Sequence, residues 1–275
     1  MIWLCLYLTL PLEASQIIIS PQSVYPGDAF FIKTDYKGLL KAAINGREFF
    51  FSSCGNGCSY TIGAIDIETE PGVYKIRIEF LDGRVIFKRL RVKKPEFPVI
   101  TMELPEDKVT LSPEDALRAE REDQLLRSLW NLKTKRLWQG GFIKPLSNEV
   151  STGYGVKRII NKHKLSIHKG IDIRATEGEP VKAVNNGRVI LTKELFFGGK
   201  TIVIDHGEGL FSVYMHLSEY AVSEGDTVSK GQTIGFTGST GRASGPHLHF
   251  GFKVGDISVN PESFFVLMGS LTLQR

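Results

Sequence analysis

The sequence lacks the features that define several common classes of protein. It holds only three cysteines in 275 residues, too few for a fold that depends on a disulfide framework. Its apolar run at the N-terminus is well short of the roughly 20 residues that a membrane-spanning helix needs. The sequence also lacks a large excess of charge of one sign, because its 34 basic and 30 acidic residues leave a net charge of only +4. We therefore expect no nucleic-acid partner, although a mildly basic protein can still bind an anionic polymer.

What remains is the composition of a soluble globular protein, with 42% hydrophobic residues and enough length for two domains. Residues 1–15, MIWLCLYLTLPLEAS, are a short apolar run that ends in small and polar residues. This pattern predicts a signal peptide, although the basic residues that usually precede the apolar run are absent. An uncleaved signal that associates with the membrane, or a buried first strand, stays open as an alternative.

Cys54 and Cys58 are the two cysteines outside this signal region, in the loop-like stretch SSCGNGCSY. The glycines between them allow a small ring to close, and an exported protein meets an oxidising compartment. Two free thiols or half of a zinc site are the rival interpretations. The sequence has no second cysteine pair to complete a cysteine-type zinc site, so we predict a disulfide between Cys54 and Cys58.

Residues 16–95 consist of short β-type runs separated by turn residues, which is typical of a small antiparallel sandwich. Asn45-Gly46 and Asp82-Gly83 stand between such runs, and both dipeptides tolerate the positive φ angles of tight hairpins. The run VYKIRIEF alternates apolar and polar residues, as a strand with one buried face does. We predict an immunoglobulin-like β-sandwich without catalytic residues, which serves packing, targeting or the binding of a regulatory protein partner.

Residues 96–141 are charged and contain proline, which indicates a connector between two domains. Ser112 followed by Pro113, with Asp115 at the third helical position, predicts a helix start. We expect this helix to span about residues 113–132. Its charged residues form a solvated face, and its apolar residues are suited to docking on a neighbouring domain.

Residues 142–275 return to glycine-punctuated β-type runs, and we predict a second, antiparallel β-domain there. The fold class predicted for the whole chain is therefore all-β with a helical connector. Five of the six histidines lie between Ile167 and Phe250. This concentration is the strongest chemical signal in the sequence.

His247 and His249 stand in the alternating stretch GPHLHFGF, which predicts a strand. Residues two apart on a strand project from the same face, so both imidazoles should point into one space. Two neighbouring core histidines would each need a hydrogen-bond partner and would repel when protonated, so the pair indicates a site. On these two residues alone, a chance strand pair explains the pattern as well as a metal site does.

The stretch HKGID adds His168 and Asp172 to this pair. Two imidazoles and one carboxylate suit catalytic zinc, with the fourth position left for water. A structural zinc site would more often close its shell with four protein ligands, commonly cysteines, and this domain contains none. The run GLFSVYMHLS places His216 two positions from Tyr214, which predicts that both side chains project from one strand face. By itself, His216 would be an ordinary surface or core histidine.

These elements occur together with further motifs in a fixed order. H-x-x-x-D is followed by Y-x-H-L-S, by GDTVSKGQTIGFTGSTG and by GPHLHF. From about Phe142 to Phe265 the series resembles the lysostaphin and LytM family of zinc endopeptidases. The resemblance implies a compact antiparallel β-domain of the duplicated-hybrid-motif type, with a metal held in a groove across its sheet.

By the matching positions, the resemblance implies that His168, Asp172 and His249 bind one zinc ion. His216 and His247 would be catalytic rather than ligating, and would move protons for a water molecule that zinc activates. His206, in the turn IDHGEG, resembles a structural feature of the family and is not expected to bind the metal.

The resemblance also implies an exported, periplasmic or envelope-associated hydrolase that acts on the peptide stems of bacterial peptidoglycan. An alanyl to diaminopimelyl cross-link and a glycine bridge are both open as the bond that is cut. Relatives that have lost metal ligands activate other wall hydrolases, so a non-catalytic regulator is the alternative, and the complete ligand set argues against it. A lipoyl-like carrier, suggested by EGDTVSKGQTIG, has no need of HKGID and HLH together.

Overall fold

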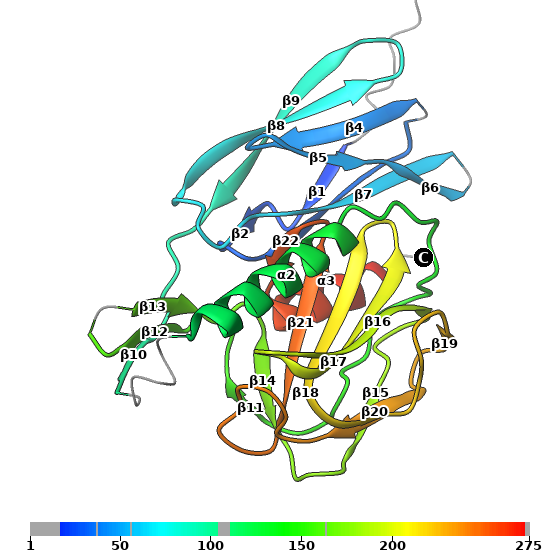
Figure 1. Cartoon of the computed structure of the whole chain (residues 1–275). Helices are drawn as coiled ribbons and strands as arrows, with labels where there is room; N and C mark the ends of the chain where they lie inside the picture. The colour runs from blue at the N-terminus through cyan, green and yellow to red at the C-terminus, as the bar shows by residue number, and fades with distance from the viewer. Residues whose placement is uncertain (1–16, 37, 56, 104–110, 163, 273–275) are drawn as a thin grey trace, which may run out of the picture. The chain divides into compact units, whose positions relative to one another are not determined.

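The computed structural model describes residues 17–36, 38–55, 57–103, 111–162 and 164–272 (Figure 1). The predicted signal at residues 1–15 lies outside the described residues. None of the helices in the described part of the chain has the length and apolar character of a membrane-spanning helix. The described fold is mostly β with few helices, which confirms the predicted β-rich class.

The chain divides into two compact units, and each is described by itself. Of the residues that the structure describes, the first unit contains those up to Ser23, Phe30–Gly63 and Gly72–Arg91, and the second contains Val24–Ala29, Ala64–Pro71 and those from Val92 onward.

The N-terminal β region contains two sheets. The strands of the first sheet follow the order β1 (Ile18–Ser20), β3 (Ala29–Thr34), β7 (Cys58–Ala64) and β6 (Ser52–Gly55). Those of the second follow the order β2 (Ser23–Val24), β9 (Val85–Val92), β8 (Gly72–Phe80), β4 (Leu39–Ile44) and β5 (Arg47–Phe50). In these sheets β1–β3, β6–β7, β4–β5 and β4–β8 pair antiparallel. The two sheets meet through apolar side chains, since the rings of Phe30 in β3 and Phe49 in β5 lie 6.0 Å apart edge to face.

The turns of this region follow the chemistry of their residues. Asn45 and Gly46 connect β4 to β5 with φ angles of 50° and 75°, and Gly83 connects β8 to β9 with φ of 84°. Cys54 in β6 and Cys58 in β7 are joined by a disulfide, as predicted.

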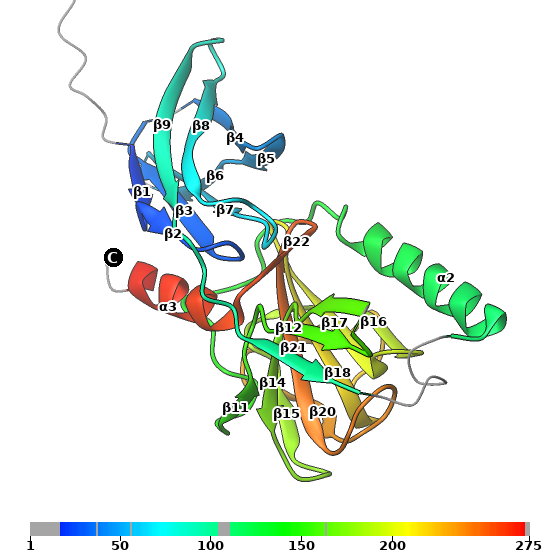
Figure 2. The same ribbon diagram turned by 90° about the vertical axis from the view of Figure 1, so that its left-hand side faces the viewer.

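Helix α2 spans Pro113–Leu129 and begins as the sequence predicts (Figure 2). The hydroxyl of Ser112 accepts a hydrogen bond from the backbone N–H of Asp115 at 3.1 Å, so the cap satisfies one amide that the first helical turn leaves free. The apolar face of the helix covers a core cluster of the large sheet. The residues that make this contact are Leu125, Leu126, Leu129 and Trp130, against Leu191, Leu195, Val203, Phe211 and Val213.

One large antiparallel sheet forms the body of the second unit. Its strands follow the order β11 (Val150–Thr152), β14 (Ile171–Arg174), β21 (His247–Val254), β18 (Leu210–Tyr220), β17 (Gly199–Gly207), β16 (Gly187–Leu195) and β19 (Thr227–Val228). Off this path, β20 (Thr233–Thr237) pairs with β18 and with β15 (Pro180–Lys182), and β22 (Ile257–Val259) pairs with β21. A separate small sheet contains β10 (Val99–Met102), β12 (Lys157–Ile160) and β13 (Lys164–Ile167).

Helix α3 (Pro261–Thr272) follows the last strand and was not predicted from the sequence. Asn260 accepts a hydrogen bond from the backbone N–H of Glu262 through its side-chain oxygen at 3.1 Å, and proline occupies the first helical position. The ring of Phe264 stacks on Phe252 in β21 at 4.0 Å. Helix α3 therefore packs against β21 and covers that end of the core.

Candidate metal centre

Two neighbouring strands bring the candidate ligands together. β14 and β21 pair antiparallel, with Asp172 directly opposite His249 and Arg174 directly opposite His247. Directly opposed residues project from the same face of a sheet, so all four side chains share one surface. His168 lies in the turn between β13 and β14, four positions before Asp172.

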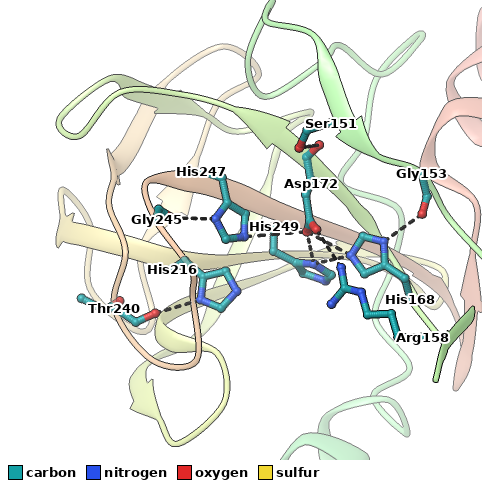
Figure 3. Close-up of polar contacts among 10 residues, drawn as sticks. All are labelled: Ser151, Gly153, Arg158, His168, Asp172, His216, Thr240, Gly245, His247 and His249. Carbon is teal, nitrogen blue, oxygen red and sulfur yellow. Dashed lines mark hydrogen bonds and ion pairs between the residues drawn. The ribbon is translucent and has the colours of Figure 1, made fainter. Parts of the chain in front are cut away.

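The three residues predicted to bind metal converge on a small volume (Figure 3). Nε2 of His168 lies 3.0 Å from Oδ1 of Asp172 and 3.0 Å from Nδ1 of His249. Nδ1 of His249 lies 2.8 Å from the same carboxylate oxygen. His168 and Asp172 are only 7% and 8% exposed, so the cluster is largely shielded from water. Two imidazole nitrogens and a carboxylate oxygen that face one point are a suitable donor set for zinc.

The ring of His168 is held in the orientation that a ligand needs. Its Nδ1 donates a hydrogen bond to the carbonyl oxygen of Gly153 at 2.8 Å. With the proton on Nδ1, the lone pair of Nε2 faces the cluster. A second hydrogen bond that fixes the tautomer in this way is the usual support of a metal-binding histidine.

Local charges favour the protonation states that bind a cation. Burial alone would raise the pKa of Asp172, but the close contacts of its carboxylate with the His168 and His249 rings outweigh burial and hold that pKa well below its ordinary value. Burial also lowers the pKa of His249, which favours the neutral imidazole. An ionised carboxylate beside a neutral imidazole is the form that ligates metal.

Gly170 in HKGID is required by the closeness of the two strands. A Cβ atom at this position would lie 2.6 Å from the carbonyl oxygen of Phe250 and 2.7 Å from Nε2 of His249. Any larger residue would therefore push against the β21 backbone and against a candidate ligand.

His216 reaches the cluster through an irregularity in β18. Up to Met215 the strand pairs with β21, where Met215 opposes His249, and from Leu217 it pairs with β20. At the change of partner, His216 adopts a positive φ of 64°. Its ring centroid lies 4.7 Å from that of His247 and 6.1 Å from that of His249.

The prediction that His216 and Tyr214 project from one strand face is wrong. Tyr214 is fully buried and packs against Phe250, on the opposite side of β21 from His249. Without the irregularity, His216 would point into the same core. The positive φ turns its imidazole onto the face that carries the candidate ligands, as a bulge does when it redirects a side chain beside an active site.

The two accessory histidines are oriented alike. Nδ1 of His216 donates to the carbonyl oxygen of Thr240 at 2.8 Å, and Nδ1 of His247 donates to that of Gly245 at 2.8 Å. This leaves Nε2 of each ring as the atom that can accept a proton. Burial lowers the pKa of His216 to about 4, so its imidazole is neutral near pH 7. Nε2 of His247 lies 3.9 Å from Oδ1 of Asp172.

All five histidine and aspartate side chains line one groove with a volume of about 1320 Å³. Its walls come from β12, from α2 and from the loop between β20 and β21. Arg158 in β12 extends toward the candidate ligands, where Nη2 lies 3.3 Å from Oδ2 of Asp172 (Figure 3). Nothing in the sequence singled out this arginine, because it lies in the run KRII without a motif around it.

His206 does not take part in the cluster. It is fully buried in β17, and its ring stacks on Phe252 with the centroids 6.1 Å apart. Its ring nitrogens bond to the carbonyl oxygen of Asn186 and the hydroxyl of Ser212, each at 2.7 Å. The residue is part of the core of the sheet.

Residues 166–261 match Peptidase family M23. The DD-carboxypeptidase/endopeptidase Mpg of Neisseria meningitidis is 37% identical over 136 residues, which cover 49% of this chain and 31% of Mpg. The peptidoglycan DD-endopeptidase ShyA of Vibrio cholerae is 37% identical over 107 residues, 39% of this chain and 25% of ShyA. Lysostaphin of Staphylococcus staphylolyticus is 38% identical over 113 residues, 40% of this chain and 24% of lysostaphin. The chain thus matches about a third or less of the length of these curated relatives.

A solved structure extends the likeness beyond the matched segment. A Pseudomonas aeruginosa protein assigned to peptidase M23 is similar with a TM-score of 0.70 and 27% identity, over 89% of this chain and 95% of that one. The similarity in fold therefore includes most of the chain and is not confined to residues 166–261.

Proposed function

Since residues 166–261 form a Peptidase family M23 domain, we propose that this protein is a zinc-dependent endopeptidase that hydrolyses peptide cross-links of bacterial peptidoglycan. The observation that carries the proposal is the convergence of His168, Asp172 and His249 on one point within a groove. The peptidoglycan DD-endopeptidase among the relatives supports the class of substrate.

His168, Asp172 and His249 would hold one zinc ion with a fourth position open. Zinc bound in this way lowers the pKa of water to about 7 and polarises a carbonyl group. The residues present fit the ion, because the donor set is complete and the carbonyl of Gly153 fixes the tautomer of His168.

His216 and His247 would carry the proton transfers. Each imidazole keeps its Nδ1–H on a backbone carbonyl and directs Nε2 toward the cluster. From there, one ring can accept the proton of the attacking water and a ring can return a proton to the leaving amine. A protonated ring would also stabilise the negative charge that develops on the carbonyl oxygen. The complete donor set and both accessory histidines disfavour the alternative of a non-catalytic regulator.

The proposal extends to the rest of the chain. We propose export to the periplasm or cell envelope through the N-terminal signal, with residues 16–95 as an immunoglobulin-like domain, 96–141 as the connector and 142–275 as the peptidase domain. The N-terminal domain would place the enzyme on the wall or bind a regulatory protein.

The test is the release of cross-linked muropeptides from purified sacculi. Protein loaded with zinc should convert cross-linked dimers to monomers, and a chelator should stop the conversion until zinc is restored. His216→Gln should lower the rate by about 10²–10⁴-fold, the usual contribution of a general acid or base, while the zinc content stays unchanged. Zinc-loaded native protein that leaves every cross-link intact would contradict the proposal.

A further inference from the structure

Two arginines from separate elements of the peptidase domain line the same groove as the candidate metal ligands. Arg158 belongs to β12, and Arg242 belongs to the loop between β20 and β21. They line the same groove as the cluster of His168, Asp172 and His249.

Arg158 has hydrogen-bonding capacity that the protein does not use. One of its terminal nitrogens lies 3.3 Å from Oδ2 of Asp172, a long contact for a charge-assisted bond. Its Nε is buried and has no hydrogen-bond partner among the described residues. A buried donor without a partner costs free energy, and a ligand that accepts from it would recover that cost.

Arg242 carries a charge that no carboxylate balances in the part of the chain that the structure describes. Its backbone N–H donates to the carbonyl oxygen of Phe197 at 3.0 Å, and its guanidinium lies over the ring of Phe197 at 4.2 Å. The aromatic ring packs against the face of the guanidinium group, and the N–H donors at the edge of that group point away from the ring. Burial and the positive charge of Arg158 lower the pKa of Arg242, as expected for two guanidinium groups that line one groove.

The acidic side chains of the groove, apart from Asp172, are already engaged. Each accepts hydrogen bonds or forms an ion pair with a residue nearby in the chain, in the pairs Arg118–Glu122, Arg127–Asp123 and Thr176–Glu179. Among the described residues, these acids therefore leave Arg242 without a carboxylate partner and Arg158 with only its long contact to Asp172.

We propose that Arg242 and Arg158 together bind a free carboxylate of the peptide substrate close to the scissile bond. The guanidinium fork matches the two oxygens of a carboxylate, and an anion in the groove that both arginines line would offset their like charges. This carboxylate site rests on the proposed function and defines the class of cross-link that the enzyme would cleave. The enzyme selects cross-links that carry a free carboxylate beside the bond and disfavours neutral bridges such as oligoglycine.

The test compares two cross-linked peptides that differ in one group, a free carboxylate or its carboxamide at the position beside the cleaved bond. Native protein should cleave the carboxylate form with a kcat/KM at least about tenfold higher, which corresponds to the contribution of one charge-assisted hydrogen bond. Arg242→Gln should abolish this preference by raising KM for the carboxylate form. Its kcat/KM for the carboxamide should fall much less than that for the carboxylate form, and its zinc content should not change.

Arg174→Gln is the matched control. Arg174 also lines the groove, but it is exposed and already faces Glu149, with Nε 3.6 Å from the carboxylate oxygen. This variant should keep the preference for the carboxylate form. Arg242→Lys, which keeps the charge and loses the fork, should retain part of it.

Three outcomes separate the inference from the function on which it rests. Equal cleavage of both peptides by the native protein overturns the inference and leaves the endopeptidase standing. An Arg242→Gln variant that loses activity equally on both peptides also overturns it, because the arginine would then act on structure alone. Zinc-loaded native protein that cleaves neither peptide and no sacculus overturns the proposed function, and the inference falls with it.

Discussion

At the scale of single residues, the backbone of His216 shows how the site departs from a regular sheet. A positive φ is costly for a residue with a Cβ atom, by about 1–2 kcal/mol. The strand accepts this conformation at the point where it changes partner from β21 to β20. The conformation places an imidazole beside His247 that a regular strand would bury in the core.

Two substitutions that both remove this imidazole should differ in stability. Asparagine tolerates a positive φ, whereas valine, which is branched at Cβ, does not. We expect His216→Val to have a free energy of unfolding about 1–2 kcal/mol lower than that of His216→Asn, as measured by urea denaturation. Both variants should be poorly active. Equal stability of the two variants would show that residue 216 is not held at a positive φ.

His206 illustrates a buried histidine with a structural role. The N–H of Val184 donates to the hydroxyl of Tyr214, which lies 3.0 Å from the hydroxyl of Ser212. The chain of bonds continues to one nitrogen of His206 and from the other to the carbonyl of Asn186. Every member is satisfied when His206 is neutral, and burial lowers its pKa from 6.5 to about 4.

This shift predicts a dependence of stability on pH. Unfolded His206 takes up a proton near pH 6.5, and folded His206 takes one up only near pH 4. Between these values the unfolded state binds more protons, so the free energy of unfolding falls as pH drops from 6.5 to 4 and levels off below. The loss from this residue is up to about 3 kcal/mol.

Denaturation across this pH range checks the prediction. His206→Gln should show a shallower fall in the free energy of unfolding between pH 6.5 and 4 than the native protein does. NMR of the folded native protein should show a neutral His206 ring at pH 5. A ring that is protonated at pH 5 while the protein is folded would rule out the account of this residue.

At the scale of elements, helix α2 is fixed to the large sheet at the groove wall. The ring of Trp130 packs edge to face on Phe211 with the centroids 5.4 Å apart. The carboxylate of Glu122 accepts a hydrogen bond from the backbone N–H of Phe196 at 2.7 Å and pairs with Arg118. Phe196 adjoins Phe197, on which Arg242 rests, so the same contact supports the groove wall.

Two acidic residues that are neighbours on this helix offer a matched comparison. Glu122→Ala should lower the free energy of unfolding by about 1.5–3 kcal/mol, because the N–H of Phe196 loses its charged acceptor. Asp123→Ala should lower it by less than about 1 kcal/mol, since that side chain is 55% exposed and only forms a surface ion pair. Urea denaturation measures both. Similar losses in the two variants would show that Glu122 does not anchor the helix.

The sequence predicts those elements that have local signals and misses those that depend on packing. Asn45-Gly46 specifies its hairpin and Ser112 its helix start, because turn and cap chemistry acts within a few residues. Helix α3 was not predicted, because the apolar content of its run PESFFVLMGSLT resembles that of a buried strand. The pairing of β10 with β12 joins segments more than 50 residues apart, and nothing local encodes it.

At the scale of the whole molecule, the candidate site is assembled from segments far apart in the chain. His168 and Asp172 lie about 80 residues before His249, and the register of β14 with β21 brings them together. The convergence of these three side chains could be predicted from motif spacing and family resemblance. The roles of Arg158 and Arg242 could not, because a groove wall has no spacing rule and each arginine stands in an ordinary sequence context.

In the proposed function, His168, Asp172 and His249 bind one zinc ion and His247 binds none. Zinc content per chain, measured by mass spectrometry on purified native protein, His249→Ala and His247→Ala, tests it most directly. We expect one zinc ion per chain in the native protein and in His247→Ala, and a loss of the metal in His249→Ala. Equal zinc in all three proteins, or a native protein that binds none at saturating zinc, would contradict it.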